Sequence, residues 1–300
     1  MAAADNVETL KAFAKTKDFF VGIDSDGCAF DTMEIKQKEC FIPNTVNYWE
    51  LQAISRFVRE TEEWVNLYSK WRGANRFPAL VKVFDLLADR PECIAIGYQC
   101  PRIDSLRRWI DTETRLGNQT LEAKVAETGD PDLKQALTWS LAVNEAVARI
   151  VRNIPPFPYV RESIEKLAGL ADMMVVSATP NEALQREWEE HGVAEFVGMI
   201  CGQEMGTKKE HLRHGAVGKY DPDKILMIGD APGDMRAAKD NGVLFYPVMP
   251  GDEAQSWKLF HDEAADKFLV GEYAGDYEQA LIDKFAACLP SAPPWPVVQG

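Results

Sequence analysis

The 300-residue chain has the composition of a folded, acidic globular protein. Hydrophobic residues make up 46% of it and charged residues 27%, a balance that allows a packed core and excludes a predominantly disordered chain. The formal net charge of -14 argues against nucleic acid and anionic membranes as partners, because both attract proteins through clustered Lys and Arg. An anionic substrate would therefore need local cations or a metal ion at its site.

The N-terminal segment and the cysteines favour a cytoplasmic location. The first twenty residues contain Asp, Glu and several Lys, unlike the apolar stretch of a signal peptide. No apolar run approaches the roughly 18 residues of a membrane span. The six cysteines are scattered without a CxxC pair, and we expect all of them to be reduced thiols: Cys28, Cys40, Cys93, Cys100, Cys201 and Cys288.

Short apolar runs predict strands that are buried on both faces, as in a parallel sheet. Four runs are clear and a fifth is weaker, in chain order 18–23, 173–176, 196–200 (the weaker one), 225–228 and 243–248. Helical segments at 181–191 and 232–241 lie between them, and a glycine follows each, at the position past a helix end that favours this residue. The alternation predicts an α/β fold with a doubly wound parallel sheet.

A long segment between the first two strands has a helical pattern instead. Its apolar residues recur three and four positions apart, for example at Leu133, Leu137 and Leu141. The pattern predicts an all-helical domain inserted into the sheet domain. We expect the insertion to span 32–158 and the sheet domain to comprise 1–31 and 159–300, with an extension at 251–300 that packs on it.

Two aspartates follow the first predicted strand directly. Asp24 and Asp26 are separated by one residue, and Gly27 comes next. Ligands of open α/β sheets bind at the carboxyl ends of the strands, where these side chains would lie. Paired carboxylates can converge on a hard cation such as Mg²⁺. The alternative is a turn with two solvated acids, which is common for Asp-rich turns.

A second acidic pair follows the strand predicted at 225–228. Asp230 would lie at the strand end and Asp234 in the first turn of the next helix. The alternative for Asp234 is a purely structural role as a helix cap, since carboxylates stabilise helix N-termini. Capping explains Asp230 less well, because the first strand of the same predicted sheet also ends in an acid, Asp24.

Two further positions have the chemistry of an anion site. Ser177 ends the strand at 173–176 ahead of a helix, where a hydroxyl and free backbone N–H groups can bind phosphate, although it could also be a simple turn residue. Lys208 or Lys209 could balance several carboxylates and grip phosphate, although a lone lysine is normally a surface charge.

In chain order, these four elements resemble the motifs of the haloacid dehalogenase superfamily of hydrolases. The matching residues are Asp24-Ser25-Asp26-Gly27, Ser177, Lys208 or its neighbour, and Asp230 with Asp234. The resemblance covers 1–31 and 159–250, and the helical insertion is similar to the cap domain of members that carry a cap after the first motif. One departure is Cys28, where Thr or Val is usual.

The resemblance implies a role for each aspartate. Asp24 would attack phosphorus and form an aspartyl-phosphate, while Asp26 would protonate the leaving oxygen and later deprotonate water. Mg²⁺ would be held by the Asp24 carboxylate, the Asp26 backbone carbonyl and Asp230. Asp234 would be a further ligand through water or the partner of the lysine. An aspartate at position 26 favours phosphate-ester chemistry, because the dehalogenases of the superfamily lack it.

The resemblance also implies how substrate is held. Ser177 and Lys208 would bind the transferring phosphoryl group. In the insertion, the cation-rich segment 69–78 suggests Arg72 and Arg76 as substrate anchors, although a solvated helix end explains them almost as well.

The sequence thus predicts a Mg²⁺-dependent phosphohydrolase that acts on a small phosphorylated metabolite. Two alternatives remain: a phosphotransferase or mutase that passes the phosphoryl group to a sugar, and a non-catalytic binding protein that retains the fold.

Overall fold

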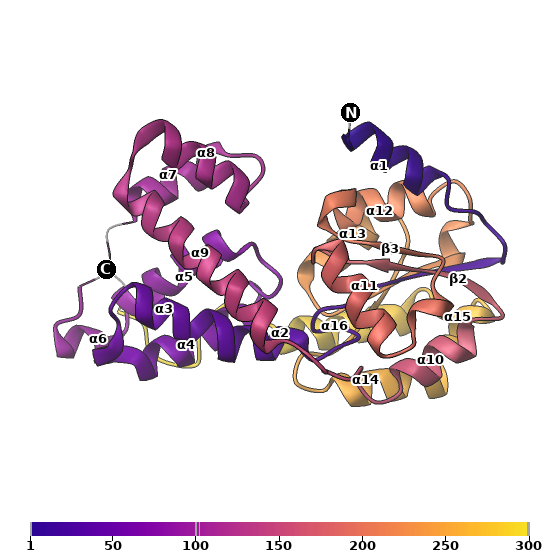
Figure 1. Ribbon diagram of the computed structural model, residues 1–300. Coiled ribbons are helices and arrows are strands. Elements are labelled where there is room, and N and C mark those ends of the chain that lie inside the picture. The colour runs from indigo at the N-terminus through magenta and orange to yellow at the C-terminus, as the bar shows by residue number, and fades with distance from the viewer. Residues whose placement is uncertain (1, 100, 102, 299–300) are drawn as a thin grey trace. The chain divides into compact units, whose positions relative to one another are not determined.

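A computed structural model describes residues 2–99, 101 and 103–298 (Figure 1). The chain divides into two compact units. We call Met1–Met33 with Asn153–Leu289 the sheet unit, and Glu34–Arg152 with Pro290–Gly300 the helical unit.

The sheet unit is built on five parallel strands in the order β3-β2-β1-β4-β5. They are β1 (Phe19–Ile23), β2 (Ala171–Val176), β3 (Met199–Cys201), β4 (Ile225–Gly229) and β5 (Leu244–Pro247). Every predicted strand is present, and the weaker candidate at 196–200 forms the short edge strand β3. The predicted α/β fold with a parallel sheet is confirmed.

Helices cover both faces of this sheet (Figure 1). Successive strand residues point to opposite faces, so Val21 and Ile23 join one core cluster while Phe20 joins another. One face is covered by α10 (Val160–Leu167), α11 (Asn181–Glu190), α14 (Glu253–Leu259) and α15 (Ala265–Leu269), and the other by α1 (Ala2–Lys11), α12 (Lys208–Gly215), α13 (Pro232–Asp240) and α16 (Asp276–Cys288). Burial on both faces explains why the strands appear in the sequence as continuous apolar runs.

The inserted segment is helical in the structure, as predicted. The short helix α2 (Thr32–Ile35) leads into it, followed by a π-helical segment, Lys36–Phe41. The remaining helices are α3 (Ile42–Tyr48), α4 (Ser55–Leu67), α5 (Arg76–Ala88), α6 (Pro91–Ile96), α7 (Asp104–Thr112), α8 (Asn118–Thr128) and α9 (Pro131–Ile150). Their core contains edge-to-face aromatic pairs, with ring centroids 5.6 Å apart for Trp49 and Trp139 and 5.1 Å apart for Phe77 and Trp109.

The domain boundaries differ in position from the predicted ones. The inserted part of the helical unit spans Glu34–Arg152, against a predicted 32–158. The larger difference concerns the C-terminus. We expected all of 251–300 to pack on the sheet domain, but Pro290–Gly300 groups with the helical unit.

Aromatic contacts explain where this C-terminal tail lies. The ring of Trp295 packs edge-to-face on Trp64 at 5.8 Å, and the Arg90 guanidinium stacks over it at 4.4 Å. The Val298 N–H donates to the Asp89 carbonyl at 2.9 Å. A proline-rich segment cannot form a helix, so its stabilisation comes from such side-chain anchors.

Among the described cysteines, Cys28, Cys40, Cys93, Cys201 and Cys288 are free thiols, as predicted, while Cys100 lies outside the described residues. Within the part of the chain that the structure describes, none of the helices has the length and apolar character needed to cross a membrane.

The carboxyl group of Glu62 is buried in the helical unit, and 2% of the surface of this residue is exposed. Its Oε1 accepts a hydrogen bond from the Thr45 hydroxyl at 3.2 Å. Burial raises the pKa of Glu62 to about 8, and the bond from Thr45 opposes this only in part. Glu62 is therefore mainly a neutral acid at pH 7.

We predict that Trp295→Ala lowers the free energy of unfolding of the helical unit by about 1–3 kcal/mol, because it removes both the aromatic and the cation–π contact. Urea denaturation checks this, with Val297→Ala in the exposed part of the same tail as the control. A loss as large in the control would contradict the anchoring role of Trp295.

We predict that the free energy of unfolding of Glu62→Gln, relative to that of wild type, increases between pH 5 and pH 8. The folded state holds the Glu62 proton up to about pH 8, whereas the unfolded state releases it near pH 4.5. The stability from protonated Glu62 is therefore complete below pH 4.5 and declines as the pH rises towards 8, by a few kcal/mol as an order of magnitude. Denaturant midpoints at pH 5, 6.5 and 8 measure the difference, with the more exposed Glu63→Gln as control. A difference independent of pH would show that Glu62 titrates normally.

Candidate active site

The carboxyl ends of β1 and β4 place two aspartates side by side. β1 lies at the centre of the sheet, and the chain order reverses between it and β4. Ile23 pairs with Ile228, and the Asp24 N–H donates to the Ile228 carbonyl at 3.0 Å. Asp24 and Asp230 thus follow neighbouring strands at the switch point where open α/β sheets bind ligands.

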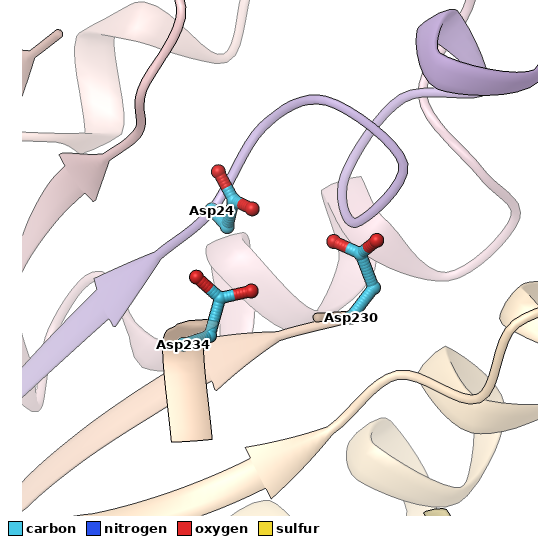
Figure 2. A group of neighbouring side chains, drawn as sticks. All are labelled: Asp24, Asp230 and Asp234. Carbon is cyan, nitrogen blue, oxygen red and sulfur yellow. The ribbon is translucent and has the colours of Figure 1, made fainter. Parts of the chain in front are cut away.

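Asp24, Asp230 and Asp234 form a buried carboxylate cluster. One carboxylate oxygen from each lies within 4.8 Å of the others, and Figure 2 shows the three groups gathered beyond the ends of β1 and β4. Gly229 makes the approach of Asp234 feasible, because a Cβ at that glycine would lie 2.4 Å from the Asp234 Cβ. The predicted convergence of the two acidic pairs is present for these three side chains.

Asp234 has two structural tasks. Its Oδ2 accepts a hydrogen bond from the Ala231 N–H at 3.0 Å and thereby caps α13, while its Oδ1 accepts one from the Lys208 ammonium. One carboxylate therefore caps α13 and contacts Lys208, and its role as a supporting site residue stays a prediction.

Lys208, not Lys209, reaches the cluster. Thr207 caps α12 through a reciprocal pair of bonds with Glu210, which places Lys208 in the first turn. Its Nζ lies 2.6 Å from Asp24 Oδ2 and also pairs with Asp234. Lys209 instead pairs with the exposed Asp240 at 2.8 Å. Adjacent helix positions point in directions about 100° apart, which is why only one of the two can enter the site.

The charges in this cluster perturb one another strongly. Burial raises the pKa of Asp24 well above its ordinary value, and Asp234 and Asp230 add to the rise, while Lys208 opposes it. Burial alone would lower the pKa of Lys208, but the charges of Asp234 and Asp24 and their hydrogen bonds raise it. Lys208 is therefore cationic, and one positive charge stands against three carboxylates. Such a site can bind a divalent cation.

Asp26 lies outside the three-carboxylate cluster. Its side chain is half-buried, and Oδ1 accepts a hydrogen bond from the buried Thr32 hydroxyl at 2.6 Å. Thr32 fixes the orientation of this carboxyl group, a contact that no motif in the sequence indicates.

Ser177 lies at the end of β2, next to β1. It is 1% exposed, its N–H donates to the Cys201 carbonyl at 2.9 Å, and its hydroxyl accepts from the Thr179 N–H at 3.3 Å. The parallel pairing of β1 with β2 brings Ser177 to the same edge of the sheet as Asp24.

Arg72 and Arg76 belong to the helical unit, where both make internal bonds. Arg72 is 4% exposed and donates to the Leu67 carbonyl at 2.9 Å. Arg76 donates to the Ser140 hydroxyl at 2.9 Å and to Asn144 at 2.7 Å, and burial lowers its pKa to about 10. These contacts give both arginines a structural task, and their role as substrate anchors stays a prediction.

Cys28, the departure from the family pattern, is buried in the loop that follows β1. Burial raises the pKa of its thiol well above the ordinary value, and the nearby carboxylates add to this, which disfavours the reactive thiolate form. Its carbonyl accepts a bond from the Trp257 indole N–H at 2.8 Å. This contact with α14, more than 200 positions along the chain, had no signature in the sequence.

A comparison with protein-family models matches residues 108–248 to the haloacid dehalogenase-like hydrolases. A comparison with curated proteins found no match. The family match confirms the resemblance seen in the motifs and indicates a hydrolase.

Solved structures with similarity to this chain include a proposed phosphoglycolate phosphatase from Lactobacillus delbrueckii subsp. bulgaricus, at 16% identity and a TM-score of 0.49, covering 87% of this chain and 100% of that one. Another is a haloacid dehalogenase-like family hydrolase from Streptococcus pneumoniae, at 15% identity and a TM-score of 0.45, covering 83% and 92%. A predicted phosphoglycolate phosphatase from Haemophilus somnus has 16% identity and a TM-score of 0.45, covering 81% and 92%. At these values none of them indicates the substrate of this chain.

We predict that Asp24→Asn stabilises the metal-free protein at pH 7 by about 1–3 kcal/mol, because it removes a buried charge that the fold disfavours. The folded pKa of Asp24 is raised, so the stability of its protonated form is lost as the pH rises, and the neutral amide avoids that loss. Denaturation in the presence of a chelator measures the effect, with the exposed Asp221→Asn as control. A variant less stable than wild type would contradict this.

Proposed function

We propose that this enzyme, a haloacid dehalogenase-like hydrolase, is a Mg²⁺-dependent phosphatase that forms an aspartyl-phosphate on Asp24. The observation that carries the proposal is the buried cluster of Asp24, Asp230 and Asp234, in which the Lys208 ammonium pairs with Asp24 and Asp234. A purely structural network would not gather three buried carboxylates around a single cation, because their repulsion disfavours the fold.

The donor set fits a hard divalent cation. It consists of carboxylate oxygens at the end of a sheet, and its charge exceeds what Lys208 neutralises. Asp24, Asp230 and the Asp26 backbone carbonyl would hold Mg²⁺, with Asp234 as a supporting residue. When bound, the ion would neutralise charge on the phosphoryl oxygens and on the carboxylates.

In the first half of the reaction, a carboxylate oxygen of Asp24 attacks phosphorus. The bond between phosphorus and the ester oxygen breaks, and Asp26 donates its proton to that leaving oxygen, so an alcohol departs. Lys208 bonds Asp24 Oδ2 and the Ser25 N–H bonds Oδ1, which fixes the carboxylate before substrate arrives.

In the second half, water attacks the phosphorus of the aspartyl-phosphate. Asp26, now ionised, accepts the proton of the water, and the bond between Asp24 and phosphorus breaks to release inorganic phosphate. The Thr32 hydroxyl holds the Asp26 carboxyl group through both steps. Each proton and bond of the cycle is restored at its end.

Ser177 and Lys208 would hold the transferring group. A phosphoryl group carries its charge on three outer oxygens, and a hydroxyl at a strand end together with an ammonium supplies donors for them. Together with a bound metal ion, the Lys208 ammonium would supply the local positive charge that an anionic substrate needs in a protein whose net charge is -14. The substrate class is therefore a small phosphorylated metabolite, and the cytoplasmic location stays a prediction from composition.

We predict Mg²⁺-dependent release of phosphate from one or more members of a panel of phosphorylated metabolites, such as sugar phosphates, phosphoglycolate and nucleoside monophosphates. Chelation of the metal should abolish the release. Asp24→Asn should lower kcat at least about 10³-fold, because a neutral amide is a far weaker nucleophile than a carboxylate.

Asp240→Asn, which alters only the surface pair with Lys209, is the matched control and should retain activity. Phosphate release that survives Asp24→Asn would overturn the mechanism. Transfer of the phosphoryl group to an added sugar instead of water would identify a phosphotransferase, and binding without turnover would favour a non-catalytic protein.

A further inference from the structure

We propose that Glu187 is a positioning residue for the reaction: acting through Ser25, it holds the loop that carries Asp24 and Asp26. The inference deepens the proposed function and rests on it. Ser25 is the residue between the two aspartates, and Glu187 lies on α11.

Ser25 makes several hydrogen bonds within the loop of residues 24–30. Its carbonyl accepts hydrogen bonds from three backbone N–H groups, those of Cys28 at 3.2 Å, Ala29 at 2.9 Å and Phe30 at 3.0 Å. Its own N–H donates to Asp24 Oδ1 at 2.8 Å. Any displacement of Ser25 therefore moves the nucleophile and the loop beyond it together.

The side chain of Ser25 is held from one helix. It is fully buried, its hydroxyl donates to Glu187 Oε2 at 2.8 Å, and it accepts from the Trp188 indole N–H at 2.9 Å. An indole N–H can only donate, so the Ser25 proton is directed to the carboxylate. Both bonds of the hydroxyl are thus fixed by adjacent residues of α11.

Helix α11 also begins at the phosphate site. Its first residue, Asn181, follows the turn that starts at Ser177, while Glu187 and Trp188 lie two turns further along. The Trp188 ring packs against Phe30 at 5.8 Å, so the same helix contacts both ends of the loop. Helix α11 is therefore linked both to Ser177, which is proposed to bind the phosphoryl group, and to the loop that carries the nucleophile Asp24.

Loss of the Glu187 contact should affect the chemical step more than binding. Ser177 and Lys208 keep their places, so KM should change by less than about threefold. A nucleophile displaced by a fraction of an ångström or more reacts more slowly, and kcat should fall about 10- to 100-fold.

The test compares four proteins. In Glu187→Ala the acceptor is removed. In Glu187→Gln the amide oxygen can still accept the Ser25 proton, and kcat should recover to within about threefold of wild type. Glu190→Ala, at an exposed position of the same helix, is the control. For each we would measure kcat, KM and the hydrogen exchange of the backbone amides of residues 28–30.

The proposal expects faster amide exchange in Glu187→Ala, a lower kcat at nearly constant KM, and rescue of both by Glu187→Gln. Faster exchange with unchanged kcat would overturn it, since the contact would then serve stability alone. Unchanged exchange would overturn it as well. If wild type hydrolyses no phosphate ester, the proposed function fails. The amide exchange of Glu187→Ala, compared with that of wild type, still decides whether Glu187 holds the loop.

Discussion

The structure depends on the balance between three buried carboxylates and one lysine. Asp24, Asp230 and Asp234 repel one another, and burial increases the cost of each charge. Lys208 offsets part of that cost by bonding two of them. The remaining negative charge disfavours the folded state without a ligand, and the proposed divalent cation would neutralise it. In such a site, an arrangement that lowers the stability of the free protein favours the binding of a ligand.

The rest of the sheet unit maintains that arrangement. Parallel pairing of β1 with β4 sets two of the acids side by side, and Gly229 leaves room for the third. Caps on α12 and α13 fix the first turns from which Lys208 and Asp234 project. The loop between Asp24 and Phe30 is held by α11 through Ser25 and by Trp257 through a backbone carbonyl. The geometry of the candidate site therefore depends on several packed elements together.

Much of this could be predicted because the signals are local. A strand buried on both faces must be apolar along its length, and polar residues at its end are then conspicuous, as at Asp24, Ser177 and Asp230. The position of the C-terminal tail, Pro290–Gly300, was predicted wrongly, because a half-buried tryptophan can pack on any apolar surface within reach. Trp295 lies on Trp64 and Arg90 in the helical unit, and nothing in residues 251–300 specified that surface.

The sequence by itself determined the strands, their parallel arrangement and the acids at their ends, since hydrophobic period and turn chemistry are encoded within a few residues. Only the tertiary structure decided which lysine enters the carboxylate cluster, because Lys208 and Lys209 differ only in the direction they leave α12. It also decided the partners of Ser25 and Cys28. Those hydrogen bonds join polar groups that need a partner of almost any kind, and the packing of helices far along the chain determines which one they meet.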